Sequence, residues 1–281
     1  MPVKSSASTA IPLFSACSMV LGSILCGCVG TPTSGLERMQ NAIVMGEMSI
    51  DEAPIDIDTV GMIDLEVDSF GGTVRIDAVP GMTGTVIEPV RRSFHGHTRR
   101  DESIETLDDI RYSVEMVKGE LDRETLVITA WTDEDEAHYQ GIDFFIQTGS
   151  IGSVKVRTER GRVWVKNNQD GVDIETTNGD IRVVTQYPMT GPMTMVTKTA
   201  DIDYRAPAGS GGHFDIESIG GRIYQRFTHT RITATSPDNG ESVFIADVGD
   251  SESPVTLRTT YGDIRVAIVD DPLDVGPFIK E

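Results

Sequence analysis

Two aspartates are the first candidates for chemistry in this sequence. Asp180 and Asp201 each follow the central residue of a repeated motif, which is Gly179 in one copy and Ala200 in the other. If neighbouring copies stack as strands, the two carboxylates lie about 4.8 Å apart. Such a pair can share a proton for acid–base catalysis or hold a divalent cation. Arginines take the same position in other copies, so we favour the alternative interpretation, a ladder of surface charges that follows the order of the chain and makes Arg222 the neighbour of Asp201.

A second row of side chains lies two positions after the first in each copy. It contains Trp164, Arg182, Asp203, Tyr224 and Arg265. Strand alternation places this row on the outward face. Aromatic rings among charges on a flat β-surface can stack on sugars, and the alternative is that they are cross-strand pairs that cover the sheet, such as Trp164 over Arg182. These residues, with Asp180 and Asp201, are the candidates for facing a ligand.

The histidines form no metal-binding signature. The closest approach is His95-Gly96-His97, which lacks acidic partners at ligand spacing and has four arginines around it. We therefore predict a solvated loop at this place, no metal site and no cofactor. The sequence also lacks a nucleophile-elbow motif or a phosphate-binding glycine loop in a suitable context, and we expect no enzyme.

The residue best suited to a covalent modification is Cys28. It ends Leu25-Cys26-Gly27-Cys28, which resembles the lipobox of bacterial lipoproteins, and it follows an apolar stretch from Ile11 to Leu25 with Lys4 as the only charge before it. We predict a signal peptide over residues 1–27 and a lipid-bearing Cys28 (including palmitate) that anchors the chain to a membrane. Because Val29 rather than aspartate follows, the outer membrane is favoured over the inner one. A secreted protein cut nearby is the alternative.

The elements that position the two rows are short strands around a central glycine. Apolar residues lie seven and five positions before that glycine and two and four positions after it, as in Val154, Val156, Val163 and Val165 around Gly161. This alternation describes two strands, each with one buried face, joined at a bend. The central residues are Gly72, Gly161, Gly179, Ala200, Gly221 and Gly262.

The spacing of the copies indicates how they assemble. From Gly161 to Gly221 the bends recur every 18 to 21 residues, which is typical of a solenoid. We predict an all-β, right-handed parallel β-helix-like solenoid with coils of about 20 residues. A serine or threonine recurs three positions before each central residue, and we expect these hydroxyls to satisfy one another in an inward ladder.

The chain divides into four parts by composition. We expect the signal peptide at 1–27, a tether at 28–54, the solenoid at 55–270 and a tail at 271–281. Residues 83–146 interrupt the repeat, with a hairpin around Lys118-Gly119-Glu120 and a short helix. Such an insertion can cap the open end of a solenoid.

The motif around the bends resembles a known family. Thr176–Ile181 and Thr259–Ile264 follow its strand pattern T-x-N-G-D-I, most plainly in the first copy. Over residues 60–270 the chain is similar to the domain-of-unknown-function 4097 (putative adhesin) family. The resemblance implies a parallel β-helix-like domain, often lipid-anchored or linked to the envelope, without an established catalytic site.

The net charge of the chain limits the classes of partner that it can bind. The chain carries a net charge of −20, and loss of Lys4 with the signal peptide leaves 23 basic residues against 44 acidic ones. Nucleic acid is therefore excluded as a partner. We expect a non-catalytic envelope lipoprotein that binds or scaffolds a surface glycan or an envelope protein. The alternatives are an envelope-stress or signalling partner, and a polysaccharide-acting enzyme on a β-helix. Cation binding by the acidic surface stays open.

Overall fold

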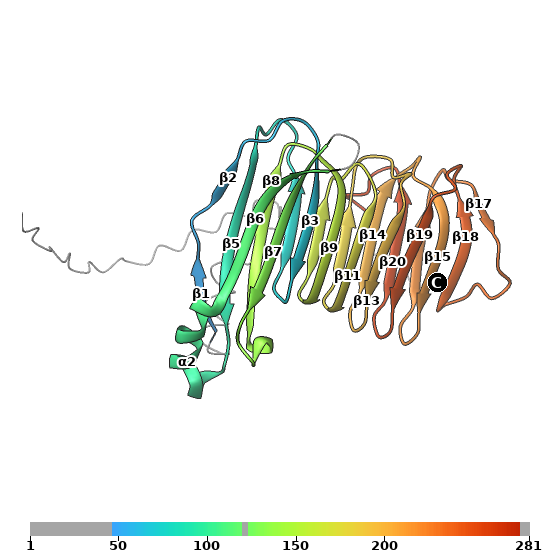
Figure 1. Ribbon diagram of the computed structural model, residues 1–281. Coiled ribbons are helices and arrows are strands. Elements are labelled where there is room, and N and C mark those ends of the chain that lie inside the picture. The colour runs from blue at the N-terminus through green and yellow to red at the C-terminus, as the bar shows by residue number, and fades with distance from the viewer. Residues whose placement is uncertain (1–46, 120–122, 276–281) are drawn as a thin grey trace, which may run out of the picture.

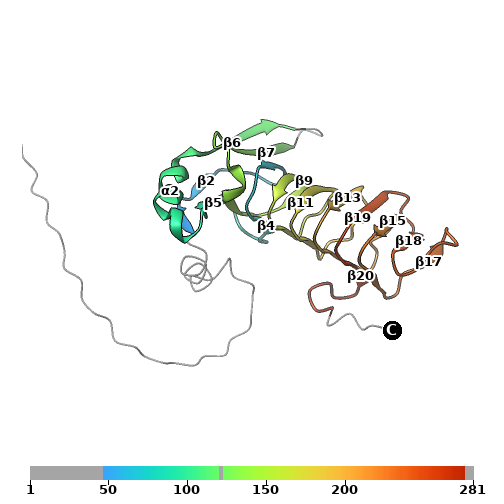
Figure 2. The ribbon, with the colours of Figure 1, turned by 90° about the horizontal axis from the view of Figure 1, so that it is seen from below.

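The computed structural model describes residues 47–119 and 123–275, and the chain is all-β with two large, mostly parallel sheets. The signal peptide, Cys28 and most of the tether lie outside the described residues. From β7 (Glu124–Thr132) to β17 (Ile232–Ala234) the strands alternate between the sheets, so the bend after each strand of one sheet leads into a strand of the other (Figure 1). The two sheets thereby form the walls of one elongated stack (Figure 2).

Each sheet contains ten strands. The first, sheet A, runs in the order β1 (Met48–Asp51), β5 (Thr85–Ser93), β8 (Gln140–Thr148), β4 (Val74–Ala78), β10 (Val163–Lys166), β12 (Ile181–Val184), β14 (Ile202–Pro207), β20 (Ile264–Val269) and β16 (Ile223–Phe227), with β2 (Ile55–Ile57) also on β5. The second, sheet B, runs in the order β17 (Ile232–Ala234), β18 (Val243–Val248), β15 (Gly212–Ser218), β19 (Pro254–Thr259), β13 (Met193–Thr197), β11 (Val172–Asn178), β9 (Ile151–Arg160), β3 (Ile63–Ser69), β7 (Glu124–Thr132) and β6 (Ile110–Lys118).

The core lies between the sheets and consists of the alternating apolar residues of the motif. In β12, Ile181 and Val183 are buried while Arg182 between them is exposed. Ile181 lies in register with Val163 of β10 and with Ile202 of β14, so equivalent residues form apolar columns along the stack. Tyr204 belongs to the same core, and burial raises the pKa of its phenol above the ordinary value.

The order of the coils departs from the order of the chain at two places. The pair β7 and β8 lies outside β3 and β4, and the last pair, β19 and β20, lies between β13–β14 and β15–β16. The prediction of stacking in chain order is therefore wrong. The second departure follows from β18, which pairs antiparallel with β15, so the chain turns back and its last coil enters the stack on the inner side of β15.

The recurring hydroxyls align as predicted, but they do not satisfy one another. Thr158 lies in register with Ser69 and with Thr176, yet its hydroxyl donates to the carbonyl oxygen of Arg160 at 3.3 Å. Thr197 and Thr259 donate to carbonyl oxygens in the bend of a neighbouring coil, at 3.1 and 2.9 Å. The hydroxyls of the column thus bond to the backbone of the bends, except that of Thr176, which is buried without a partner among the described residues.

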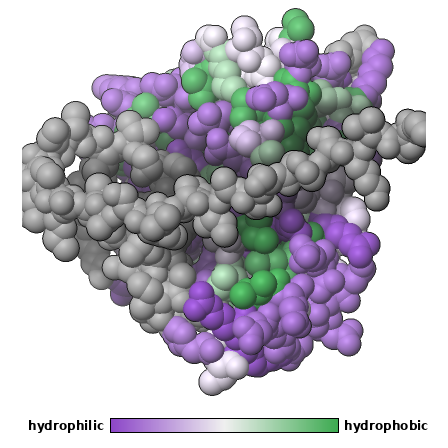
Figure 3. Space-filling view, turned by 90° about the vertical axis from the view of Figure 1, so that its left-hand side faces the viewer, coloured by the Kyte–Doolittle hydropathy of each residue, from purple (hydrophilic) through white to green (hydrophobic). Residues whose placement is uncertain are grey.

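Antiparallel strands lie at one end of sheet A and at both ends of sheet B, where β18 and β17 form the far edge, whereas the far edge of sheet A is β16, parallel to β20. At one end β5 pairs with β8, and β6 and β7 form the hairpin expected around Lys118. The helical segments η1 (His97–Arg99), α2 (Arg100–Glu105) and η2 (Thr106–Asp109) lie at this capped end, and η4 (Ala137–Tyr139) precedes β8. The space-filling view of this end shows mostly hydrophilic residues with smaller hydrophobic areas among them (Figure 3). Within residues 47–119 and 123–275, no helix is long and apolar enough to cross a membrane.

Candidate functional site

The residues after the bends form one row along the edge of the stack. The strand register orders it as Thr73, Arg162, Asp180, Asp201, Asp263 and Arg222. Asp180 and Asp201 are neighbours, as predicted from the repeat. The prediction that Arg222 lies beside Asp201 is wrong. Asp263 lies between them because β20 stacks directly on β14.

Each aspartate of this row holds the next coil through its backbone. The Oδ1 atom of Asp180 accepts a hydrogen bond from the N–H of Asp201 at 3.3 Å, and that of Asp201 accepts one from the N–H of Asp263 at 2.8 Å. Asp263 in turn accepts one from the N–H of Arg222 at 2.9 Å. An aspartate after the glycine therefore supplies an acceptor that the bend needs.

Guanidinium groups engage the second oxygens of these carboxylates. Arg265 lies 2.8 Å from Oδ2 of Asp201 and 3.5 Å from Oδ2 of Asp263, and Arg162 lies 3.6 Å from Oδ2 of Asp180. These contacts offset the repulsion between adjacent carboxylates. They favour the charge-ladder interpretation of Asp180 and Asp201 over a shared proton or a bound cation.

The outward row lies on the flat face of sheet A. Its order along the sheet is Arg75, Trp164, Arg182, Asp203, Arg265 and Tyr224. Trp164 and Arg182 lie opposite each other in the register, as expected, but the cation–π contact of the Trp164 ring is with Arg75. The guanidinium of Arg75 lies over the Trp164 ring at 5.9 Å, while Arg182 faces Asp203 at 3.5 Å, because β4 stacks against the other side of β10.

This face presents two aromatic rings on either side of a charged middle. Arg265 lies over the ring of Tyr224 at 5.9 Å, and Asp203 accepts two hydrogen bonds from Arg205 at 2.8 Å each. Trp164 and Tyr224 stay partly exposed. The arrangement can offer ring faces and paired charges to a flat or extended ligand.

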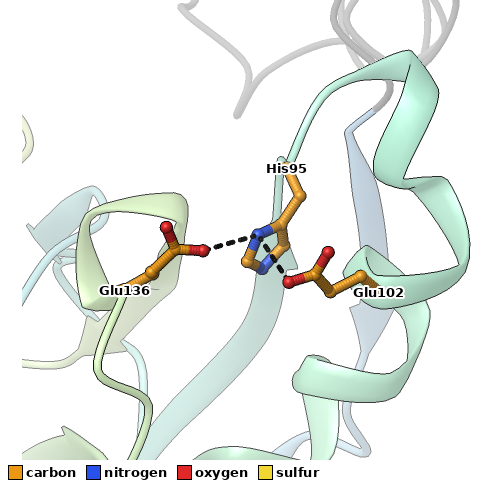
Figure 4. Close-up of side chains that lie close together, drawn as sticks. All are labelled: His95, Glu102 and Glu136. Atoms are coloured by element: carbon orange, nitrogen blue, oxygen red, sulfur yellow. Dashed lines mark ion pairs between the residues drawn. The ribbon is translucent and has the colours of Figure 1, made fainter.

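A third group of side chains lies at the capped end, where the sequence analysis expected a solvated loop. That expectation is wrong for His95, whose side chain is 0 % exposed, whereas His97 is exposed. The Nδ1 atom of His95 lies 3.9 Å from a carboxylate oxygen of Glu102 in α2 and 3.9 Å from one of Glu136, next to η4 (Figure 4). Arg99 bridges the two glutamates by hydrogen bonds, and its bond to Glu102 is the main cause that lowers the pKa of that carboxyl below the ordinary value.

Glu102 and Glu136 were not predicted as partners of His95. The sequence contains one signal for the burial of His95. In the alternation of β5, His95 lies on the same side as the buried residues Thr85, Ile87 and Ser93. Glu136 follows β7, on the far side of the hairpin in the sequence, and only the fold brings it to β5. Spacing along the chain therefore gave no indication of the cluster.

The fold defines the class of protein as all-β with two large, mostly parallel sheets. Within that class, the chain is similar to a crystal structure described as a "putative cell adhesion protein" from Clostridium sporogenes, with 10 % identity and a TM-score of 0.51 over 78 % of this chain and 99 % of that one. A "putative adhesin" from Bacteroides fragilis matches with 11 % identity and a TM-score of 0.26, over 78 % of this chain and 96 % of that one. No protein-family model matches the sequence, and no curated protein matches it significantly. At 10 % identity the likeness to the first of these structures concerns the fold alone.

Proposed function

We propose that the chain is a non-catalytic lipoprotein of the bacterial cell envelope whose domain binds or scaffolds an envelope component, as an adhesin does. The observation that carries the proposal is the outward face of sheet A. There, Trp164 and Tyr224 lie in one strand register with charges that are already paired. Paired charges and partly exposed rings suit recognition of an extended surface glycan or an envelope protein better than proton transfer.

The finer features of the proposal come from the sequence and from the fold. The stacked coils fit a right-handed parallel β-helix, since crossovers between parallel strands are right-handed in nearly all proteins. They also fit the domain-of-unknown-function 4097 family, and the fold likeness to a protein described as a cell adhesion protein supports an adhesin-like role. A partner role in envelope signalling would use the same face.

The proposed lipid anchor depends on Cys28. We expect mass spectrometry of the mature amino terminus to show a diacylglyceryl Cys28, and we expect Cys28→Ala to release the chain from the membrane fraction. The reason is the Leu25-Cys26-Gly27-Cys28 sequence after an apolar segment. Density separation of the membranes tests the outer-membrane placement. A Cys28→Ala chain that is exported normally and stays equally membrane-bound would contradict the lipid anchor.

A further inference from the structure

One nitrogen of the His95 ring contacts the hydroxyl of Thr106, and the other nitrogen faces Glu102 and Glu136. The Nε2 atom lies 3.1 Å from the hydroxyl oxygen of Thr106. That hydroxyl also lies 2.9 Å from the carbonyl oxygen of Glu102 and 3.0 Å from the hydroxyl oxygen of Ser93. When its one hydrogen goes to the carbonyl oxygen, which can only accept, Nε2 of the neutral ring carries the ring hydrogen and Nδ1 presents a lone pair.

This lone pair is buried and points at negative charge. Among the residues that the structure describes, Nδ1 of His95 has no hydrogen-bond partner. The ligand atoms of His95, Glu102 and Glu136 all lie within 4.8 Å of one another. A lone pair that faces two carboxylates away from water is unfavourable unless a positive charge lies among them.

The protein places one of its own cations at this spot. The same oxygen of Glu102 and the same oxygen of Glu136 that face His95 each accept a hydrogen bond from Nη2 of Arg99. The side chain of Arg99 is 35 % exposed, and it lies over the ring of Tyr139 at 5.4 Å. A side chain of this length at the surface can move into solvent without disturbing the core.

We propose that Nδ1 of His95 and the carboxylates of Glu102 and Glu136 bind a divalent transition-metal ion, with zinc preferred, and that the ion displaces the guanidinium of Arg99. One imidazole nitrogen and two carboxylates are a three-ligand set that leaves a fourth position for water. Ligand bonds of about 2.0–2.2 Å put tetrahedral ligand atoms roughly 3.3–3.5 Å apart. The two distances of 3.9 Å from Nδ1, and the limit of 4.8 Å that spans all three ligand atoms, require the partly exposed side chains of Glu102 and Glu136 to close by up to about 1.3 Å.

The donor set and its surroundings select the kind of ion. Calcium takes six to eight oxygen ligands, and magnesium keeps several waters, whereas imidazole suits zinc. The hydrogen bond from Nε2 to Thr106 orients the ring, as partners of metal-binding histidines commonly do. A bound ion would tie α2 to the residues before β8, and it would thereby fix the capped end of the stack.

Zinc titration of the full chain tests the site. We would replace Cys17, Cys26 and Cys28 by serine so that no thiol binds the metal, and follow zinc by calorimetry and by thermal unfolding, with calcium as the comparison ion. We expect one zinc per chain, a higher Tm with zinc and no saturable effect of calcium. His95→Gln should weaken zinc binding by at least about tenfold, since loss of even an outer partner of a ligand costs 10–100-fold.

Two further variants separate a metal site from a merely structural histidine. Arg99→Gln should tighten zinc binding because the competing cation is gone, and the surface variant Glu136→Gln should weaken it without removing a buried group. His213→Gln is the matched control, since Nδ1 of His213 also lies 2.7 Å from a carboxylate but is exposed. Absence of saturable zinc binding, unchanged binding in Glu136→Gln, or no tightening in Arg99→Gln would overturn the proposal.

Discussion

Replacement of Ile181 by aspartate is expected to lower the free energy of unfolding by roughly 3–5 kcal/mol, the cost of an uncompensated buried charge. Ile181 is 0 % exposed and packs between Val163 and Ile202, so a carboxylate there would lie in an apolar column without a cation. Equilibrium denaturation in urea, followed by circular dichroism, measures the loss.

The neighbouring residue gives a matched control for this substitution. Arg182 points outward from the same strand, and its ion pair with Asp203 is 3.5 Å long and partly exposed. Arg182→Ala should therefore change the free energy of unfolding by less than about 1 kcal/mol. Equal harm from the two substitutions would show that the strand faces are assigned incorrectly.

Replacement of Gly179 by alanine should cost about 3 kcal/mol, the upper end of the range for overpacking. An added Cβ would lie 1.8 Å from the carbonyl oxygen of Gly161 in the next coil, and both atoms belong to the backbone. Neither coil can move aside without breaking the hydrogen bonds between the bends, such as that from the N–H of Gly161 to Asn178 at 2.9 Å. Thermal or urea unfolding of the variant measures the effect.

Gly240→Ala is the control for this second substitution. Gly240 lies in an exposed turn, and the nearest heavy atom to its added Cβ is the carbonyl oxygen of Asp238 at 3.9 Å. Its effect should stay within about 0.5 kcal/mol. A Gly179→Ala chain as stable as the parent would contradict the close contact between stacked bends.

The strands could be predicted from the sequence because burial depends on a local pattern. The alternation around Gly161 and Gly179 specifies which face of each strand is apolar, and the observed register, Val163 opposite Ile181, follows from matching those faces. In the copy that has Ala200 in place of the central glycine, the backbone next to the bend pairs differently. At Ala200 the preceding residues change their pairing, since the N–H groups of Lys198 and Thr199 both bond to the carbonyl oxygen of Thr177 at 3.2 Å.

The order of the coils could not be predicted from the same pattern. Every copy offers similar apolar columns, so the pattern of β14 accepts β16 or β20 as a neighbour equally well. The antiparallel pairing of β18 with β15 determines that β20, and not β16, lies beside β14. This pairing depends on the irregular segment near Gly240. This is why Asp263, not Arg222, lies beside Asp201.

The cluster of His95, Glu102 and Glu136 at the capped end could not be predicted from the sequence, for a different reason. His95, Glu102 and Glu136 come from three segments of an insertion that has no repeat, and tertiary contacts alone bring them together. The tautomer of His95 depends in addition on Thr106 and on the carbonyl group of Glu102. No spacing rule contains these contacts.

The most direct measurement of the proposed function is binding of envelope glycan and envelope protein fractions to the purified mature chain, with sugar release monitored in parallel. The face variant Trp164→Ala/Tyr224→Ala is compared with Glu66→Ala/Lys155→Ala, which removes an exposed ion pair on sheet B, after thermal unfolding has shown both to be folded. We expect one fraction to bind without release of sugars, the face variant to bind about tenfold more weakly or worse, and the sheet B variant to bind as the parent does. Equal binding by the two variants, no binding of either fraction, or release of sugars that Asp180→Asn/Asp201→Asn abolishes would contradict a non-catalytic binding face on sheet A.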